Sequence, residues 1–186
     1  MSDDTDDNDS TDVYSIERRN TVITYDITLS ENIEHPPFKY AKLCNLLRDE
    51  VLEDDIVNIH ISNYGGSCDS AATIVNAMKD CPGTINCIVN APSYSAATMI
   101  ALAGHTLTLK PYSYLMFHNF STVEGGKGAE LKGSILNAER VIHSMMKSLY
   151  LGFLSSVEIN NLFNDKDVYV HWDDSDLTER LNKLKV

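Results

Sequence analysis

The 186-residue chain predicts an α/β fold built from repeated β-α units. Segments with the alternating or β-branched pattern of strands are followed by segments whose apolar residues recur at helical spacing, and this alternation favours mostly parallel pairing. A chain of this length with 43% hydrophobic residues is sufficient for one domain with a real core. We therefore expect a single domain over residues 13–186.

The first twelve residues are expected to lie outside that domain. Six of them are Asp, and the others are Met, Ser, Thr and Asn, so the segment has almost nothing to bury. Such composition is typical of a disordered acidic tail. This tail carries half of the net charge of −12.

The elements follow from the hydrophobic pattern in chain order. β-branched, aromatic or alternating apolar segments predict strands at 21–29, 56–61, 85–89, 106–109, 114–117 and 168–170. Helical periodicity predicts four helices with both ends defined, at 68–79, 129–154, 157–163 and 175–185. Two further helices are expected to begin at Pro36-Pro37 and directly after Ser95. The helix 129–154 is longer than one small core needs, so we expect it to project and pack on another subunit.

Composition excludes several classes of partner. The pI of about 4.7 argues against nucleic acid and anionic membranes. The longest apolar stretch, near 96–103, is too short to span a bilayer, and the acidic start is unlike a signal peptide. The four Cys residues have no metal-ligand spacing, so we expect reduced core thiols, no metal and a cytoplasmic location.

Ser95 is the first candidate for chemistry because it lies where a strand gives way to a helix. An apolar run ends at Val89, and ten small and aliphatic residues then lead to Gly104. Unpaired N–H groups of a first helical turn favour developing negative charge near a hydroxyl. The alternative is that Ser93 or Ser95 only caps the helix, as most Ser residues before an apolar run do.

Three further segments offer the other groups that acyl transfer requires. Gly65 and Gly66 follow the strand 56–61, and a glycine turn can present backbone N–H groups to an oxyanion. His118 follows the strand 114–117 and is suited to act as a general base. An acidic residue before 168–170, Asp167 or its competitor Asp165, would orient that histidine. Taken alone, each has an ordinary structural interpretation as a turn, a capped histidine or a capping carboxylate.

The order of these motifs resembles the ClpP peptidases, the proteolytic subunit of the Clp machines, over about residues 19–184. The segment Ile-Ser-Asn-Tyr-Gly-Gly-Ser at 61–67 is similar to the family's strand-end turn. Ser95-Ala96-Ala97 followed by Gly104 is similar to its nucleophile helix, which selects Ser95 over Ser93. Leu-Met-Phe-His-Asn at 115–119 is similar to its histidine motif, and the spacing from His118 selects Asp167 over Asp165.

The resemblance implies a catalytic triad on a ClpP/crotonase-like fold. In it, Ser95 is the acylated nucleophile, His118 the general base and acid, and Asp167 the residue that orients His118. The backbone N–H groups of Gly65 and Ala96 would bind the oxyanion. The resemblance implies no cofactor and no metal.

The family's handle corresponds to about residues 121–154, a Gly-rich strand followed by the long helix. A strand at 125–131 would hold an extended peptide by backbone pairing, with Gly66, Gly125 and Gly126 as substrate-binding residues. The implied assembly is a homo-oligomer of heptameric rings stacked as a tetradecamer. Its substrates would be unfolded polypeptides, delivered by an AAA+ unfoldase of the Clp ATPase type.

Some positions depart from the family pattern and keep two alternatives open. Tyr64 and Phe120 stand where the family has Pro, Ala97 where it has Gly, and Val168 where it has a charged residue. A catalytically inactive structural ring subunit is therefore one alternative. A crotonase-type acyl-CoA enzyme is another, since its related fold also uses a strand-end oxyanion hole.

Overall fold

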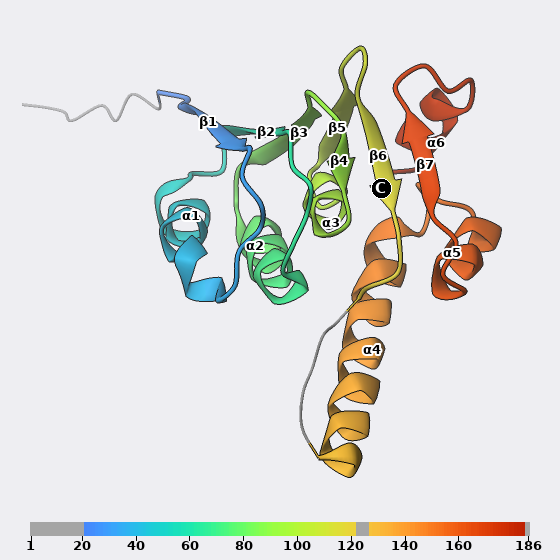
Figure 1. Ribbon diagram of the computed structural model, residues 1–186. Helices are drawn as coiled ribbons and strands as arrows, with labels where there is room; N and C mark the ends of the chain where they lie inside the picture. Colours follow the sequence, from blue (N-terminus) through green and yellow to red (C-terminus); the bar gives the residue numbers. More distant parts are fainter. Residues whose placement is uncertain (1–20, 122–126, 185–186) are drawn as a thin grey trace, which may run out of the picture.

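A computed structural model describes residues 21–121 and 127–184 of the chain and confirms the mixed α/β class (Figure 1). The strands are β1 (Thr24–Leu29), β2 (Ile56–Ile61), β3 (Thr84–Val89), β4 (Ser93–Tyr94), β5 (Thr106–Leu109), β6 (Tyr114–Phe117) and β7 (Val168–His171). The helices are α1 (Ala41–Asn45), α2 (Cys68–Asp80), α3 (Ala96–Ala101), α4 (Gly128–Tyr150), α5 (Ser156–Phe163) and α6 (Leu177–Lys183). The acidic tail and the expected domain boundary at residue 13 lie outside the described residues.

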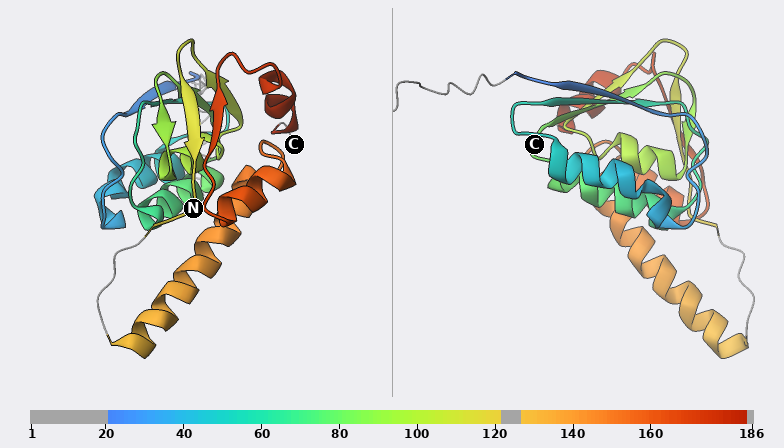
Figure 2. Two further views of the ribbon diagram at one scale, coloured as in Figure 1. Left: turned by 45° about the vertical axis from the view of Figure 1, so that its right-hand side comes forward. Right: turned by 90° about the vertical axis from the view of Figure 1, so that its left-hand side faces the viewer.

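The larger sheet has four parallel strands in the order β1-β2-β3-β5. Its register pairs Ile59 of β2 with Ile27 on one side and with Cys87 on the other. Alternate residues of β2 and β3 are fully buried on one face, which α1 and α2 cover together (Figure 2). The period-two pattern in the sequence therefore matches a sheet with one covered face.

The other face of this sheet carries a ladder of polar side chains. Asn58 donates to Asp26 (3.0 Å), Asn86 donates to Asn58 (3.1 Å), and Thr106 donates to Asn86 (2.8 Å). The four residues stand on four neighbouring strands, so the chain of bonds crosses the whole sheet. These bonds let an open sheet face remain in contact with water without exposing an apolar surface.

The smaller sheet brings together the segments that carry the candidate catalytic residues. Its order is β4-β6-β7, with β4 parallel to β6 and β7 antiparallel to it. The sequence does not predict β4, because a two-residue strand has no periodicity to detect. Its presence nevertheless decides the geometry of the residue that follows it.

The long helix α4 projects from the body, as the sequence predicts (Figures 1 and 2). Its buried residues, Met146, Leu149 and Tyr150, all lie at its C-terminal end. Further out, Leu136 and Val141 are 54% and 53% exposed. The predicted strand at 125–131 is wrong for its second half, because Gly128 already begins the helix. Gly125 and Gly126 lie outside the described residues.

Other boundaries differ for local reasons. The segment after Pro36 is not one regular helix but a 3₁₀ turn at Pro37–Tyr40, α1, and a π turn at Leu46–Glu50. The first strand begins at Thr24, and α6 begins only at Leu177. Helix α4 ends four residues early because the chain turns through Gly152, whose φ of +102° suits glycine.

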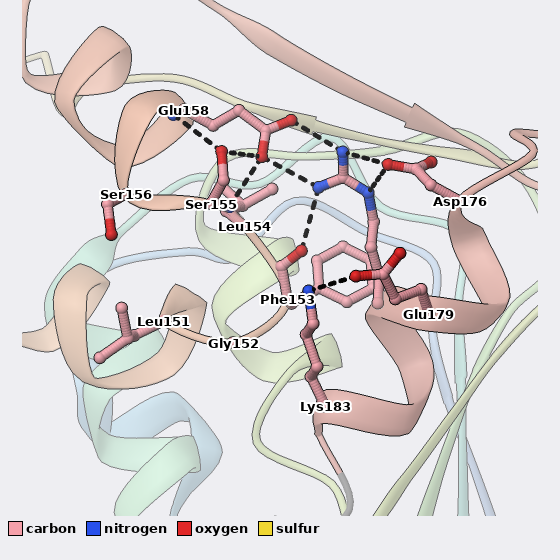
Figure 3. Close-up of a pocket in the computed structure, with 11 residues that line it drawn as sticks. Leu151, Gly152, Phe153, Leu154, Ser155, Ser156, Glu158, Asp176, Glu179 and Lys183 are labelled. Atoms are coloured by element: carbon pink, nitrogen blue, oxygen red, sulfur yellow. Dashed lines mark hydrogen bonds and ion pairs between the residues drawn. The ribbon is translucent and has the colours of Figure 1, made fainter.

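The C-terminal segment is held by a cluster of hydrogen bonds and ion pairs that includes Glu158 and Asp176 (Figure 3). Arg180 of α6 binds both carboxylate oxygens of Glu158 at 2.8 and 3.1 Å and donates to the Phe153 carbonyl at 3.0 Å. Asp176 forms a further ion pair with it at 2.8 Å. Glu158 also completes a capping box with Ser155 at the start of α5. The cluster therefore ties α6 to α5.

Candidate active site

Ser95 lies at a sharp turn between β4 and α3. Its φ of 56° and ψ of −127° are unusual for a residue with a side chain, and its hydroxyl forms no capping bond to α3. Ser95 therefore occupies the N-cap position of α3 without capping the helix through its side chain. A serine on a strained strand-to-helix turn is the geometry called a nucleophile elbow. The chain adopts it without the GxSxG pattern.

Hydrogen bonds on both sides hold this turn in place. The Ser95 N–H donates to the Met116 carbonyl (2.9 Å), which extends the pairing of β4 with β6. The Ser95 carbonyl accepts from both the N–H (2.9 Å) and the hydroxyl (2.7 Å) of Thr98. Thr98 in turn bonds to the hydroxyl of the buried Tyr150 at the base of α4 (2.8 Å). The strain at Ser95 is thus supported by three elements.

Gly65 lies directly against the elbow. A Cβ atom built on Gly65 would meet the Tyr94 carbonyl oxygen at 2.6 Å, the Ser95 Cβ at 2.7 Å and the Ala96 nitrogen at 3.1 Å. Its φ of +88° also favours glycine. The structure therefore brings the Gly-Gly turn, Ser95 and Ala96 together, although they are about 30 residues apart in sequence.

The backbone N–H of Gly65 is already engaged. It donates at 2.8 Å to Oδ1 of Asn63, a buried residue whose amide group also bonds to the Glu31 carbonyl. This bond occupies the N–H group that the family resemblance assigns to the oxyanion hole. Glycine composition alone does not reveal which of two adjacent N–H groups is in use.

The next residue, Gly66, has the opposite orientation. The Ile33 N–H donates to the Gly65 carbonyl (2.8 Å), and the Ser67 N–H donates to the Ile33 carbonyl (2.7 Å), which forms a parallel bridge between Ile33 and Gly66. In such a bridge the N–H and C=O of the central residue point to the other edge. The polar backbone groups of Gly66 therefore face away from Ile33.

The strand register places His118 and Asp167 at the same end of the smaller sheet as Ser95. Tyr94 pairs with Met116, and Phe117 pairs with Val168. Continuing both registers by one residue puts Ser95 beside Phe117 and His118 opposite Asp167. Asp165 would face Phe120 instead. His118 is half-buried and Asp167 is exposed.

Within the described ranges, no hydrogen bond joins Ser95, His118 and Asp167. The three residues share a neighbourhood set by the sheet, but their side chains are not engaged with one another in this conformation. Catalytic contacts in a serine hydrolase often form fully only when substrate is bound. Sequence and register therefore identify the candidates, and their roles stay predictions.

Asp165 is engaged in a different contact. Its carboxylate accepts a hydrogen bond from the amide of Asn119 (2.9 Å), the residue after His118. The Asn119 Oδ1 atom accepts from its neighbour's N–H at Phe120 (3.0 Å) and from Nε2 of His143 on α4 (2.8 Å). Sequence analysis missed this cluster because Asn119, His143 and Asp165 lie far apart along the chain, and no local pattern indicates that they meet.

A cluster of tyrosines beside the elbow was also missed. Tyr94, Tyr114 and Tyr169 lie on one face of the smaller sheet, and the ring of Tyr64 lies 5.2 Å from that of Tyr94. The Tyr94 and Tyr114 hydroxyls form a 2.5 Å hydrogen bond, which raises the pKa of Tyr94 to about 12. The Tyr94 hydroxyl is therefore neutral at physiological pH. Tyr94, Tyr114 and Tyr169 lie far apart in the sequence, so their common face becomes evident only once the pairing of β4, β6 and β7 is known.

The four cysteines are free thiols, and burial raises the pKa of Cys87 to about 12. Among the described residues, no group of three or more His, Cys, Asp or Glu is arranged to hold a metal ion. No helix in the described part of the chain has both the length and the apolar character needed to cross a membrane.

Comparison with known families decides the relationship. Residues 8–155 match the family model of Clp protease. The chain belongs to the Clp protease family. The matched range of this Clp protease homologue includes the Gly65-Gly66 turn, Ser95 and His118 but ends before Asp167. A search of curated proteins finds no match.

Proposed function

We propose that this member of the Clp protease family is a serine endopeptidase. The observation that carries the proposal is the position of Ser95 on a strained elbow, packed against Gly65 and adjacent to the strand end that carries His118. Family membership favours peptide hydrolysis over the acyl-CoA chemistry of crotonases.

The proposed reaction is acyl transfer through a covalent intermediate. The Ser95 Oγ attacks the scissile carbonyl while His118 removes its proton. His118 then gives that proton to the departing amine, and water hydrolyses the acyl-enzyme by the same route. Asp167 orients His118 and stabilises its charged form.

The proposed oxyanion hole consists of the N–H groups of Ala96 and Gly66. Ala96 opens α3, so its N–H has no partner inside the helix. We prefer Gly66 to Gly65 because the Gly65 N–H donates to Asn63. The exposed backbone edge of Gly66 also suits pairing with an extended peptide. Gly125 and Gly126, the other proposed substrate-binding residues, lie outside the described range.

The proposed biological form is a ring. A nonspecific peptidase is confined most safely when its active sites face an enclosed chamber, and α4 offers exposed apolar residues for contacts between copies. We propose a homo-oligomer, with heptameric rings stacked as a tetradecamer, that receives unfolded polypeptides from a Clp-type AAA+ ATPase in the cytoplasm. An inactive ring subunit is the competing proposal, because the triad side chains are not hydrogen-bonded to one another.

A fluorophosphonate tests the proposal directly, because it reacts only with activated serines. We expect peptide mass spectrometry to locate the adduct on Ser95, with no labelling in Ser95→Ala or His118→Ala. Asp167→Asn should slow labelling about 100-fold or more, whereas Asp165→Asn should slow it far less. The comparison uses two carboxylates from the same turn as matched variants.

The outcomes separate the alternatives. An assembled protein that remains unlabelled, alone and with candidate Clp ATPases, would support the inactive subunit. Loss of assembly in Ser95→Ala would mean that Ser95 is structural. A stronger effect of Asp165→Asn than of Asp167→Asn would move the triad carboxylate to Asp165.

A further inference from the structure

Asn119 connects three segments of the chain around the candidate site. It follows His118 directly, its amide nitrogen binds the Asp165 carboxylate at 2.9 Å, and its amide oxygen accepts from His143 at 2.8 Å. These partners stand on the turn before β7 and on helix α4. The polar atoms of the Asn119 side chain are therefore all committed within the chain.

We propose that Asn119 is a positioning residue that keeps His118 and Asp167 aligned across the β6-β7 pair. The proposal rests on the proposed peptidase function. Regular pairing in that sheet ends at Phe117 and Val168, so backbone bonds alone do not hold the next residues together. The Asn119–Asp165 bond closes the sheet just beyond them, with His118 and Asp167 enclosed between pairing and bond.

Further hydrogen bonds support both ends of this bond. The Asn119 side chain is fixed by the Phe120 N–H at 3.0 Å. Asp165 has a φ of 57°, and its turn is held by bonds from its own N–H to Leu162 and from the Lys166 N–H to Asn161, each 3.0 Å long. The bond therefore joins a side chain held next to His118 to a turn held by backbone hydrogen bonds two residues before Asp167.

His143 adds the third contact and joins the projecting helix to the site. Its ring stacks on Phe163 with centroids 4.1 Å apart, and the Lys147 Nζ lies over the Phe163 ring at 5.2 Å from its centroid. Burial lowers the pKa of His143, with Lys147 acting in the same direction and Glu139 and Asp165 opposing it. Because Asn119 Oδ1 is an acceptor, the neutral imidazole must carry its proton on Nε2.

An exchange of the amide and the carboxylate tests the bond itself. Asn119→Asp places two carboxylates in contact and removes the donor. Asp165→Asn alone keeps the bond, because the new amide oxygen at position 165 can still accept from the Asn119 amide nitrogen. In Asn119→Asp/Asp165→Asn the donor lies on the other side, and the carboxylate at position 119 still accepts from Phe120 and His143. Only the first of these chains loses the bond.

The measurement is fluorophosphonate inactivation at Ser95, resolved into the maximal rate and the half-saturating concentration. We expect Asn119→Asp to lower the maximal rate about 10- to 100-fold with an unchanged half-saturating concentration. Asp165→Asn and the double variant should stay within about threefold of the parent chain. A merely structural role would instead lower the melting temperature or the assembled fraction, so both are measured alongside.

Asn119→Ala removes the bond without adding a charge, and it should also reduce the maximal rate. It therefore tests the inference even if Asn119→Asp fails to fold. Parent-like rates in a folded Asn119→Asp or Asn119→Ala would overturn the inference, as would a double variant no faster than Asn119→Asp. Failure of the parent chain to react at Ser95 would instead refute the proposed function, and the inference would fall with it.

Discussion

At the residue scale, the backbone conformation of Ser95 depends on the space that Gly65 leaves beside it. A positive φ at a residue with a side chain costs about 1–3 kcal/mol, and surrounding structure must maintain it. Here the Met116 carbonyl and Thr98 hold the turn, and Gly65 leaves the space that a Cβ would fill. The small residue next to the nucleophile is thus required by packing as well as by backbone conformation.

Gly65→Ala should damage the elbow. The new Cβ would lie 2.6 Å from the Tyr94 carbonyl oxygen and 2.7 Å from the Ser95 Cβ, at a φ of +88°. We expect a loss of about 3 kcal/mol in the free energy of unfolding and no fluorophosphonate labelling. Urea unfolding and labelling of the same samples provide the measurement.

Gly133→Ala is the matched control for that substitution. Gly133 is exposed in α4, and a Cβ built on it meets nothing within 4 Å beyond the backbone of its own helix and its chain neighbours. Replacing it should stabilise the chain by about 0.5–1 kcal/mol. If both variants behaved alike, close packing of Gly65 on Ser95 would not explain the first result.

At the element scale, specific contacts anchor two helices that lie outside the sheets. The base of α4 buries Tyr150, which bonds to Thr98 below the elbow and meets Phe117 edge-to-face, with centroids 5.0 Å apart. Farther along the chain, Arg180 fastens α6 to Glu158 of α5. These contacts explain how a long projecting helix and a short terminal helix remain attached to a small body.

The Glu158–Arg180 contact should make stability depend on pH. Arg180, followed by Ser155, lowers the pKa of Glu158 to about 2 from an ordinary 4.5. A lowered folded-state pKa means that the stabilisation is complete above about pH 4.5 and disappears as the pH falls toward 2. Glu158→Gln should therefore cost about 2 kcal/mol at pH 7 and almost nothing near pH 2.

Urea unfolding of the parent chain and the variant at pH 7 and at low pH checks this expectation. Glu179→Gln serves as the control, because Glu179 pairs with Lys183 at an exposed position and should change stability little at either pH. A Glu158→Gln effect that persisted at low pH would contradict an ionic origin.

At the scale of the whole molecule, the chain consists of a packed body and one helix, α4, that projects from it. The body buries both sheets in one core, whereas the outer part of α4 keeps apolar side chains in water (Figure 1). Such residues contribute little to folding of one copy. Their presence is consistent with the proposed ring assembly.

Leu136→Ser/Val141→Ser should therefore weaken assembly without unfolding the chain. Both residues are more than half exposed on α4, so their apolar contacts would be made with another copy. Sedimentation velocity should show smaller particles, while circular dichroism stays unchanged. Val157→Ser, which alters an exposed apolar residue on α5, should leave particle size as it is. If the parent chain, the α4 double variant and Val157→Ser all formed particles of equal size, a role of α4 in assembly would be contradicted.

The amino-acid pattern by itself determined the fold class and most of the elements. Strand 56–61 is predicted with its observed bounds, because alternation of buried and exposed residues is written locally in the chain. Helix 68–79 is predicted to within one residue for the same reason. The motifs around Ser95 and His118 likewise lead to the family that the family model confirms.

The tertiary structure alone decided how those residues meet. It revealed β4, the backbone conformation of Ser95, the bond that occupies the Gly65 N–H, and the engagement of Asp165 with Asn119. Strand β4 exists only through its pairing with β6, and the Asp165–Asn119 bond joins residues 46 apart in the sequence. The bond at the Gly65 N–H is local, but its acceptor Asn63 is itself bonded to the distant Glu31 carbonyl. Local pattern records which face of an element is buried, but only the assembled sheets determine which atoms lie within bonding distance.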